Sequence, residues 1–406
     1  MGCPIPSSAT VDEYSTYIDY IEGQYVTPNP QPLTFTATES GTFKLSGNSV
    51  SYSLDSGETW TTLASNTDSP TVSAGSKIMW KATLTPSSNG IGRFSSTANF
   101  TVEGNIMSLL YGDNFSTRGS LYGKDYAFQN LFSGCTRVTS AENLLLPATI
   151  LADSCYIGMF QGCTSLTTAP SVLPATALAK SCYYNMFNGC SGLTTAPELH
   201  ATTLASSCCG SMFYNCTSLT TAPELPATTL ATQCYNGMFQ GCTSLTTAPS
   251  LPATTLETFC YYGMFQGCTS LTTAPELHAT TLANYCCGSM FQGCTSLTTA
   301  PSLPATTLVI QCYIQMFKGC TSLTTAPELP ATTLASNCYY QMFYGCTSLN
   351  YIKAMFTTTP TDAYMDNWVN GVASSGTFVK NNAATWTISC DVSTYPCNWT
   401  VETASS

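Results

Sequence analysis

The sequence predicts a β/α repeat solenoid of 26-residue units, with an N-terminal antiparallel β-sandwich domain and a small C-terminal β cap. Three observations predict this fold. Two cysteine columns recur through the middle of the chain, residues 33–104 alternate between polar and apolar side chains, and the repeat stops near residue 351. A fixed period of about 20–50 residues marks a solenoid, in which one unit cannot bury its apolar face alone.

The composition favours a folded chain with few charges. Charged residues make up 8% of the 406 residues, against about 25% in an ordinary domain. Hydrophobic residues reach 44% and aromatic residues 11%, which is enough to build a core. The net charge is −11, and the 11 Lys and Arg residues form no run. Nucleic acid is therefore not an expected partner, because phosphates require clustered basic side chains.

Two cysteine columns define the repeat, which occupies residues 126–351. Members of the first column are spaced 28, 27 and then six times 26 residues apart, and each usually follows a glycine. The second column lies eight residues upstream of the first. The first column is Cys135, Cys163, Cys190, Cys216, Cys242, Cys268, Cys294, Cys320 and Cys346, and the upstream column is Cys155, Cys182, Cys208, Cys234, Cys260, Cys286, Cys312 and Cys338.

Local signals place the elements of one unit, for which residues 234–259 serve as the example. The apolar positions of residues 234–242 have helical spacing, so a short helix or helical turn is predicted there. Residues 245–251 then give the Leu-x-x-Ala-x-x-Leu step of a strand. We expect that strand to be very short, because Pro249 restricts its hydrogen bonding.

The repeated string M-F-x-G-C-T-S-L-T-T-A-P-x-L-P resembles the core of BspA-like leucine-rich repeats, which occur on bacterial surface proteins and in some phage proteins. This sequence departs from the family pattern at Met238, where the family has Ala, and at Ala248-Pro249, where the family has a strand Ile. The strings YSLDSGETWTTL and GTFVKNNAATW resemble β modules that accompany this repeat type. The resemblance implies a leucine-rich-repeat-like solenoid on a surface-displayed protein.

The segments outside the repeat have distinct roles in this prediction. Residues 33–104 form the β-sandwich, residues 105–125 a connector, and residues 352–406 a β cap that contains Trp368 and Trp386. Residues 1–32 are expected to hold an amphipathic helix over residues 10–23 and a proline-rich spacer. That helix is either a packing element or a docking segment for another protein. The candidate docking residues are Val11, Tyr14, Ile18 and Ile21.

The repeat cysteines are predicted to be reduced and buried. In a helix the two cysteines of one unit would lie roughly 12 Å apart, beyond the reach of a disulfide. A continuous column of cysteines also favours no particular disulfide pairing between stacked units. In addition, Cys often acts as a small buried hydrophobe. Disulfides and a metal site stay as alternatives, and Cys390 and Cys397 are a separate pair that can form a bridge.

No catalytic, cofactor or metal site is predicted, so the sequence indicates a protein that is not an enzyme. The sequence contains none of the motifs that mark a serine nucleophile, a zinc site, a phosphate-binding loop or a dinucleotide-binding fold. His200 and His278, the two histidines, lie three units apart, too far to share a metal or a proton. Carboxylates in the array are sparse and fall in one column, shared with serine, which limits the stacking of like charges. They are Glu198, Glu224, Glu276 and Glu328.

Two surfaces are candidates for binding. One is formed by columns of paired threonines, for which the alternative is a solvated strand face. Ice binding is disfavoured there, since neighbouring threonines are expected to point to opposite faces. The other is the variable edge, which we define as the residues next to the upstream cysteine column, where tyrosines gather. The candidates are Thr220, Thr221, Thr246, Thr247, Thr272, Thr273, Thr298, Thr299, Tyr235, Tyr261, Tyr262, Tyr339 and Tyr340.

These features favour a virion structural or adhesion protein that attaches to a host-surface glycan or protein. The N-terminus lacks the basic and apolar regions of a signal peptide, so synthesis in a cytoplasm without membrane insertion is expected. The expected location is the virion surface, with other virion proteins bound through the N-terminal region and homo-oligomers possible. The alternative is a bacterial cell-surface adhesin of the BspA-like family, which requires an export signal.

Overall fold

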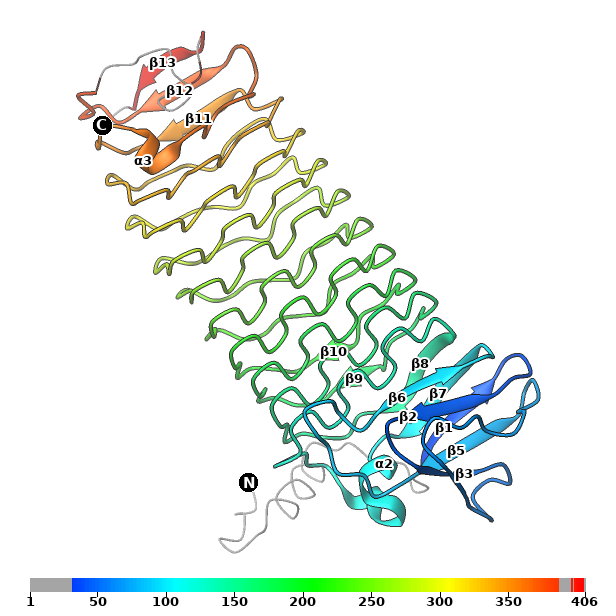
Figure 1. Cartoon of the computed structure of the whole chain (residues 1–406). Coiled ribbons are helices and arrows are strands. Elements are labelled where there is room, and N and C mark those ends of the chain that lie inside the picture. The colour runs from blue at the N-terminus through cyan, green and yellow to red at the C-terminus, as the bar shows by residue number, and fades with distance from the viewer. Residues whose placement is uncertain (1–30, 387–395, 397, 405–406) are drawn as a thin grey trace, which may run out of the picture. The chain divides into compact units, whose positions relative to one another are not determined.

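The computed structural model describes residues 31–386, 396 and 398–404 (Figure 1). The chain divides into two compact units, Met1–Ala201 and Thr202–Ser406. The predicted docking helix, with Val11, Tyr14, Ile18 and Ile21, lies outside the described residues. Cys390 and Cys397 lie outside them as well.

Unit 1 begins with a mixed β-sheet domain. Its main sheet has the strand order β4-β3-β5-β1-β7-β8, and β2 pairs with β6 in a second sheet. Strand pairs within residues 33–104 are antiparallel, as predicted, but β8 joins β7 in parallel, so the main sheet is mixed and includes part of the first repeat. The elements are β1 (Leu33–Ala37), β2 (Phe43–Ser46), β3 (Val50–Ser53), β4 (Thr61–Leu63), β5 (Lys77–Lys81), β6 (Arg93–Ser96), β7 (Phe100–Asn105), α2 (Ser108–Tyr111), η1 (Gly112–Thr117) and β8 (Val138–Leu145).

An aromatic core joins the sheet domain to the first coil of the repeat. The Phe35 ring on β1 is fully buried, and its centroid lies 4.9 Å from those of Phe94 and Phe100. Phe132, from the first coil, lies 5.8 Å from Phe35 and stacks on Phe94 at 5.7 Å. The sheet domain therefore covers the start of the coil stack, and one core continues from the sheet into the coils of this unit.

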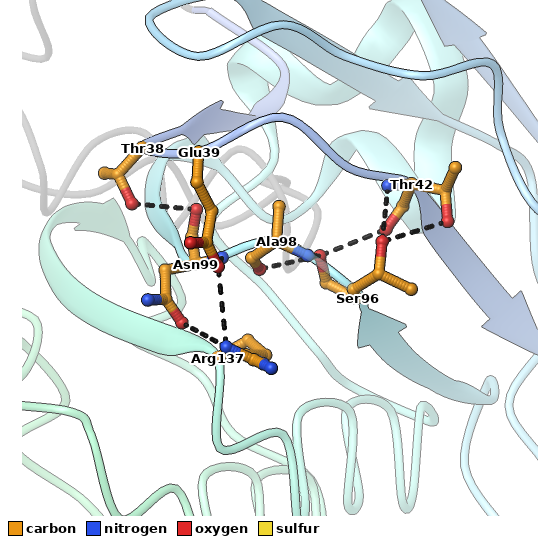
Figure 2. A network of polar contacts seen from close by, with 8 residues as sticks. Thr38, Glu39, Thr42, Ser96, Ala98, Asn99 and Arg137 are labelled. Atoms are coloured by element: carbon orange, nitrogen blue, oxygen red, sulfur yellow. Dashed lines mark hydrogen bonds and ion pairs between the residues drawn. The ribbon is translucent and has the colours of Figure 1, made fainter.

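A polar network lies over the same junction (Figure 2). Glu39 Oε1 accepts a hydrogen bond from the Asn99 backbone N–H at 2.9 Å and one from Arg137 Nη1 at 3.4 Å. Arg137 also donates to the Asn99 side-chain oxygen at 3.3 Å, and its carbonyl accepts from the Phe100 N–H at 3.0 Å. Because the Glu39–Arg137 pair is half exposed, it contributes at most about 1 kcal/mol. The backbone pairing and the aromatic core hold the junction.

The turn between β3 and β4 is closed by the carboxylate of Asp55. The Ser53 hydroxyl donates to this carboxylate at 2.7 Å and the Thr59 backbone N–H donates to it at 2.9 Å. Trp60 Nε1 donates to the Gly57 carbonyl at 3.0 Å on the same turn. Hydrogen bonds from Ser53 and Thr59 stabilise the charged carboxylate and lower the pKa of Asp55 to about 2.

This turn should weaken only in strong acid. The folded pKa of Asp55 lies below its ordinary value of 3.8, so the stabilising contribution is complete above about pH 4 and is lost as the pH falls through about 2. A carboxyl NMR titration should place the Asp55 midpoint near 2, and a Ser53→Ala variant should move it back toward 3.8. An Asp55 midpoint near 3.8 in the unchanged protein would contradict the hydrogen-bonded turn.

The segment that carries both cysteine columns is a series of tight turns in each coil, so the predicted short helix is wrong. The Cys234 N–H donates to the Ala231 carbonyl of its own coil at 3.1 Å. The next N–H, that of Tyr235, donates to the Cys260 carbonyl of the following coil, also at 3.1 Å. This alternation continues to Cys242. Half of the N–H groups thus bond within the coil and half bond to the next coil, unlike an α-helix.

A left-handed residue at every fourth position produces this alternation. In the same coil these residues are Gln233, Gly237 and Gly241, with φ values of 59°, 58° and 75°. Residues of L-configuration enter this region singly rather than as a helix, and glycine does so at no steric cost. At Gly267, the equivalent of Gly241, an added Cβ would lie 3.8 Å from the Gly241 Cα, an ordinary contact, so the positive φ and not lack of space favours glycine there.

The predicted short strands are present in reduced form. Unit 1 has a parallel pair formed by β9 (Val172–Leu173) and β10 (Glu198–Leu199). In unit 2 the equivalent segments make isolated parallel bridges, such as Thr247 with Thr221 and Leu277 with Leu251. The coils of unit 2 therefore rely on the turn segment for most of their backbone pairing.

The stack continues into residues 352–386, where the sequence motif is lost. The Phe343 N–H donates to the Trp368 carbonyl at 2.8 Å, and the Trp368 ring, fully buried, lies 6.0 Å from the Phe343 ring. The predicted β cap contains β11 (Tyr351–Ala354), β12 (Thr377–Lys380) and β13 (Thr400–Thr403), which pair in parallel. The short helix α3 (Asp362–Met365) precedes Trp368. By this hydrogen-bond register Trp368 takes the place of the buried methionine Met342, and Val369 takes the place of Phe343.

Candidate binding surface

Both cysteine columns lie inside the coils. The first column also forms hydrogen bonds, since the Cys242 thiol donates to the Phe213 carbonyl of the preceding coil at 3.1 Å and the Cys268 thiol donates to the Phe239 carbonyl at 3.1 Å. Burial raises the pKa of Cys242 and Cys294 to about 12. Cys286 differs, because a hydrogen bond with the neighbouring Cys287 lowers the pKa of Cys286. The predicted burial of the columns is confirmed, since every cysteine between residues 135 and 346 is buried.

Replacing Cys268 with Ala should destabilise unit 2 by about 1–2 kcal/mol, because the variant loses both a thiol hydrogen bond and a buried sulfur. Thr280 of the same coil is exposed, and Thr280→Ala should change stability by less than about 0.5 kcal/mol. Urea unfolding of both variants tests this expectation. Equal midpoints for the two variants would show that the Cys268 thiol is dispensable.

The candidate tyrosines separate into buried and half-buried groups. Tyr235, Tyr261 and Tyr339 are at most 2% exposed, and Tyr235 stacks on Tyr261 with ring centroids 6.2 Å apart. These three side chains belong to the core and are not available to a ligand. Tyr262 and Tyr340 are half-buried and do reach the surface.

The paired threonines are all exposed, contrary to the expectation that neighbours point to opposite faces. Thr246 and Thr247 both reach solvent, as do the equivalent pairs Thr220/Thr221, Thr272/Thr273 and Thr298/Thr299. The first threonine of a pair also bonds between coils, since Thr298 Oγ1 donates to the Thr272 carbonyl at 3.1 Å and Thr246 Oγ1 to the Thr220 carbonyl at 3.5 Å. The Thr columns are an exposed polar surface whose first hydroxyl supports the stack.

The histidine and glutamate side chains of the array are exposed, and, in the part of the chain that the structure describes, those that form ion pairs do so with a single partner. His200 Nε2 lies 3.5 Å from a Glu198 carboxylate oxygen, and both side chains are largely exposed. Glu328 pairs with Lys353 at 3.0 Å. His278 is exposed. Within the described residues, no group of three or more His, Cys, Asp or Glu side chains is placed to hold a metal ion.

Two shallow hollows in unit 1 share Ser46 and Arg93. One, of about 330 Å³, is also lined by Gln129 and Asn130 of the first coil, and the other, of about 360 Å³, by Ser133 and Cys135. Neither brings a nucleophile together with a general base. They do not form a catalytic arrangement of the usual kind.

Comparisons of the chain with protein-family models, with curated proteins and with solved structures give no match. None of the described helices has the length and apolar character needed to cross a membrane. The function is therefore inferred from the exposed side chains of the coils.

The variable edge of unit 2 holds an aromatic cluster that the sequence reasoning identified only in part. Tyr262 was a candidate, whereas Phe259 and Tyr285 were not. The signal was available in the repeat, because the position before the upstream cysteine is Gln in the two flanking coils, at Gln233 and Gln311. Aromatic residues interrupt a polar column at Phe259 and Tyr285.

Proposed function

We propose that the chain is a non-enzymatic virion protein that displays its coils for attachment to a host-surface glycan or protein. The observation that carries the proposal is the difference between the buried and the exposed side chains of each coil. The repeated Cys, Met and Phe side chains of the two cysteine columns and the phenylalanine ladder are buried in the stack, whereas the Thr columns expose uncharged hydroxyl groups from coil to coil. Sequence variety gathers on one edge. Such a surface suits repeated or adhesive contacts better than a single shaped pocket.

The resemblance of the repeat to BspA-like leucine-rich repeats supports display on a surface, and we propose that the coils are a distant, turn-built form of that solenoid. On this proposal the N-terminal region contacts other virion proteins, and the last coils with their β strands act as a cap. The alternative is a bacterial cell-surface adhesin of the same family. In both proposals the coils lie on the outside of the virion or of the cell, where they contact a binding partner.

Mass spectrometry of purified virions made from the genome that encodes this chain tests the proposal. We expect peptides of the coils in intact particles, at a copy number comparable with other structural proteins. Detection on the surface of the producing cells but not in particles would favour the adhesin alternative. Absence of the chain from particles that are otherwise complete would remove the virion proposal.

A further inference from the structure

Two positions of each coil form the outer part of the variable edge. They are the residue before the upstream cysteine and the second residue after it. In unit 2 the first position is occupied in order by Ser207, Gln233, Phe259, Tyr285, Gln311 and Asn337, and the second by Gly210, Asn236, Tyr262, Gly288, Ile314 and Tyr340. Most coils carry small or amide side chains at the first position. Only two consecutive coils of this unit carry aromatic rings there.

The three rings of these coils form one cluster at the surface. Phe259 stacks on Tyr285 with ring centroids 4.5 Å apart and an interplanar angle of 15°. Tyr262 meets Phe259 edge to face at 5.5 Å. All three side chains are half-buried, so each keeps part of its ring in solvent. The exposed Ile310, with 47% of its surface accessible, belongs to the following coil.

Gly288 leaves space for the Tyr262 ring. A Cβ added to Gly288 would lie 2.8 Å from Cδ2 and Cε2 of Tyr262, and 2.8 Å from Cγ2 of Ile314. Tyr262 thus extends from its own coil across the backbone of the next one. Any larger residue at position 288 would displace the ring, so the glycine and the tyrosine act together.

The fold does not require aromatic residues at these positions. Phe259 and Tyr285 have φ values of 56° and 58°, a region that bulky residues seldom adopt and that Asn or Gly occupies more easily. The flanking coils adopt the same conformation with Gln233 and Gln311. Half-buried rings recover only part of the burial energy of a core residue. The positive φ belongs to this turn position in each coil from Ser207 to Asn337, so the aromatic residues are a departure in sequence that the backbone does not call for.

We propose that Phe259, Tyr262 and Tyr285 form a binding site for a neutral saccharide unit of a surface polysaccharide, with Gln233 and Gln311 at the equivalent positions of the two flanking coils. The inference rests on the proposed function and names its ligand class. Aromatic rings pack against the apolar face of a sugar, and side-chain amides bond to its hydroxyl groups. The Gln233 Oε1 atom accepts from the Ser207 hydroxyl at 3.1 Å, so Gln233 would act through its NH₂ group as a donor. Residues 257–262 and 283–288 contain one charged side chain, Glu257, and this carboxylate disfavours an acidic saccharide.

A protein partner fits this cluster less well. A stable protein interface buries about 800 Å² on each partner. Three half-buried rings expose much less than this, and the Thr columns and amides of the coils are polar. The site has the size and chemistry of one or two sugar rings, and repetition of the ligand along a polymer would raise the avidity of many displayed copies.

Affinity electrophoresis of the full chain tests the site. The gels contain one polysaccharide each, namely galactomannan, glucomannan, a β-glucan, mannan or xylan as neutral probes and alginate as the acidic one. The test variants are Phe259→Gln with Tyr285→Gln, which install the residue of the flanking coils, and Tyr262→Asn, which copies Asn236. Tyr214→Gln is the matched control, because Tyr214 is a half-buried tyrosine of unit 2 outside the cluster and Gln240 occupies the equivalent position of the next coil. Thermal unfolding confirms that each variant is folded.

We expect at least one neutral polysaccharide to retard the unchanged protein. The double variant and Tyr262→Asn should each bind it about ten-fold more weakly or worse, with the control within about two-fold. Equal retardation of the test variants and the unchanged protein would overturn the site. Retardation by alginate alone, or by no probe, would overturn the ligand class. Presence of the chain in virions together with these negative results would leave the proposed display function standing and remove the saccharide inference.

Discussion

Replacing Phe265 with Ala should lower the free energy of unfolding of unit 2 by about 3–5 kcal/mol. The ring is fully buried and stacks between Phe239 at 5.7 Å and Phe291 at 5.6 Å, so its removal opens a cavity in the middle of the ladder. Neighbouring coils cannot collapse into that space, because their backbones are held together by hydrogen bonds. Chemical denaturation should show the loss as a lower midpoint.

Hydrogen exchange can locate the effect of this substitution. In a stack, each coil contacts only its neighbours, so amides of the two adjacent coils should exchange much faster, while those of the sheet formed by β1 and β5 should not change. The exposed Thr273 supplies a control, and Thr273→Ala should stay within about 0.5 kcal/mol of the unchanged protein. A loss below about 1 kcal/mol for Phe265→Ala would show that the ladder does not stabilise the coils.

Alkaline solution should destabilise the coils strongly. Burial raises the pKa of Cys242, Cys294 and Cys346 to about 12 in the folded chain, against an ordinary thiol value of 9.0. The folded pKa lies above the unfolded one, so the stability contributed by each neutral thiol is complete below about pH 9 and is lost as the pH rises toward 12. Each thiol loses on the order of 1 kcal/mol between pH 9 and 10, so several together lose several kcal/mol.

Calorimetry at pH 7, 9 and 10 measures this effect. The melting temperature should fall little between pH 7 and 9 and steeply between pH 9 and 10. A Cys242→Ala/Cys294→Ala variant starts from a lower stability but should lose less in the steep interval, because two ionising thiols are absent. A melting temperature that stays level to pH 10 would contradict the buried, neutral thiol columns.

The period of the repeat and its buried residues could be predicted from the sequence, because both depend on side-chain chemistry alone. Cys, Met, Phe and Leu recur at fixed positions, and a stack of coils is the one arrangement that buries them together. Alternation of apolar residues likewise predicted the strands of the N-terminal sheet. The parallel strand β8 could not be read in this way, since it comes from the repeat and pairs across more than thirty residues.

The conformation of the turn segment depended on a signal that apolar spacing does not carry. The periodicity at residues 234–242 is equally compatible with a helix and with a chain of turns. Glycines four residues apart, at Gly237 and Gly241, distinguish the two, because both have positive φ. Coils that carry Ser or Gln at the equivalent of Gly237 conceal this pattern, as Ser211 and Gln315 do.

The candidate tyrosines and threonines were only partly placed as predicted, because the turn conformation of the coils was not predicted. A helix would have exposed a different set of tyrosines, whereas the turns bury Tyr235 and Tyr261 and leave Tyr262 at the surface. Likewise, strand alternation suggested opposite directions for Thr246 and Thr247, but each strand is reduced to a single bridge and both residues face solvent. Loss of regular strand geometry removes the rule that alternation depends on.

A count of reactive thiols tests most directly the central claim that the coils are stacks of turns around reduced cysteine columns. Purified protein is alkylated at neutral pH without reductant, first folded and then denatured, and each modified cysteine is assigned by mass spectrometry. The structure predicts that the 19 cysteines between residues 135 and 346 resist the reagent in the folded protein and all react after denaturation. Finding most of them already oxidised, or alkylated before denaturation, would contradict the account.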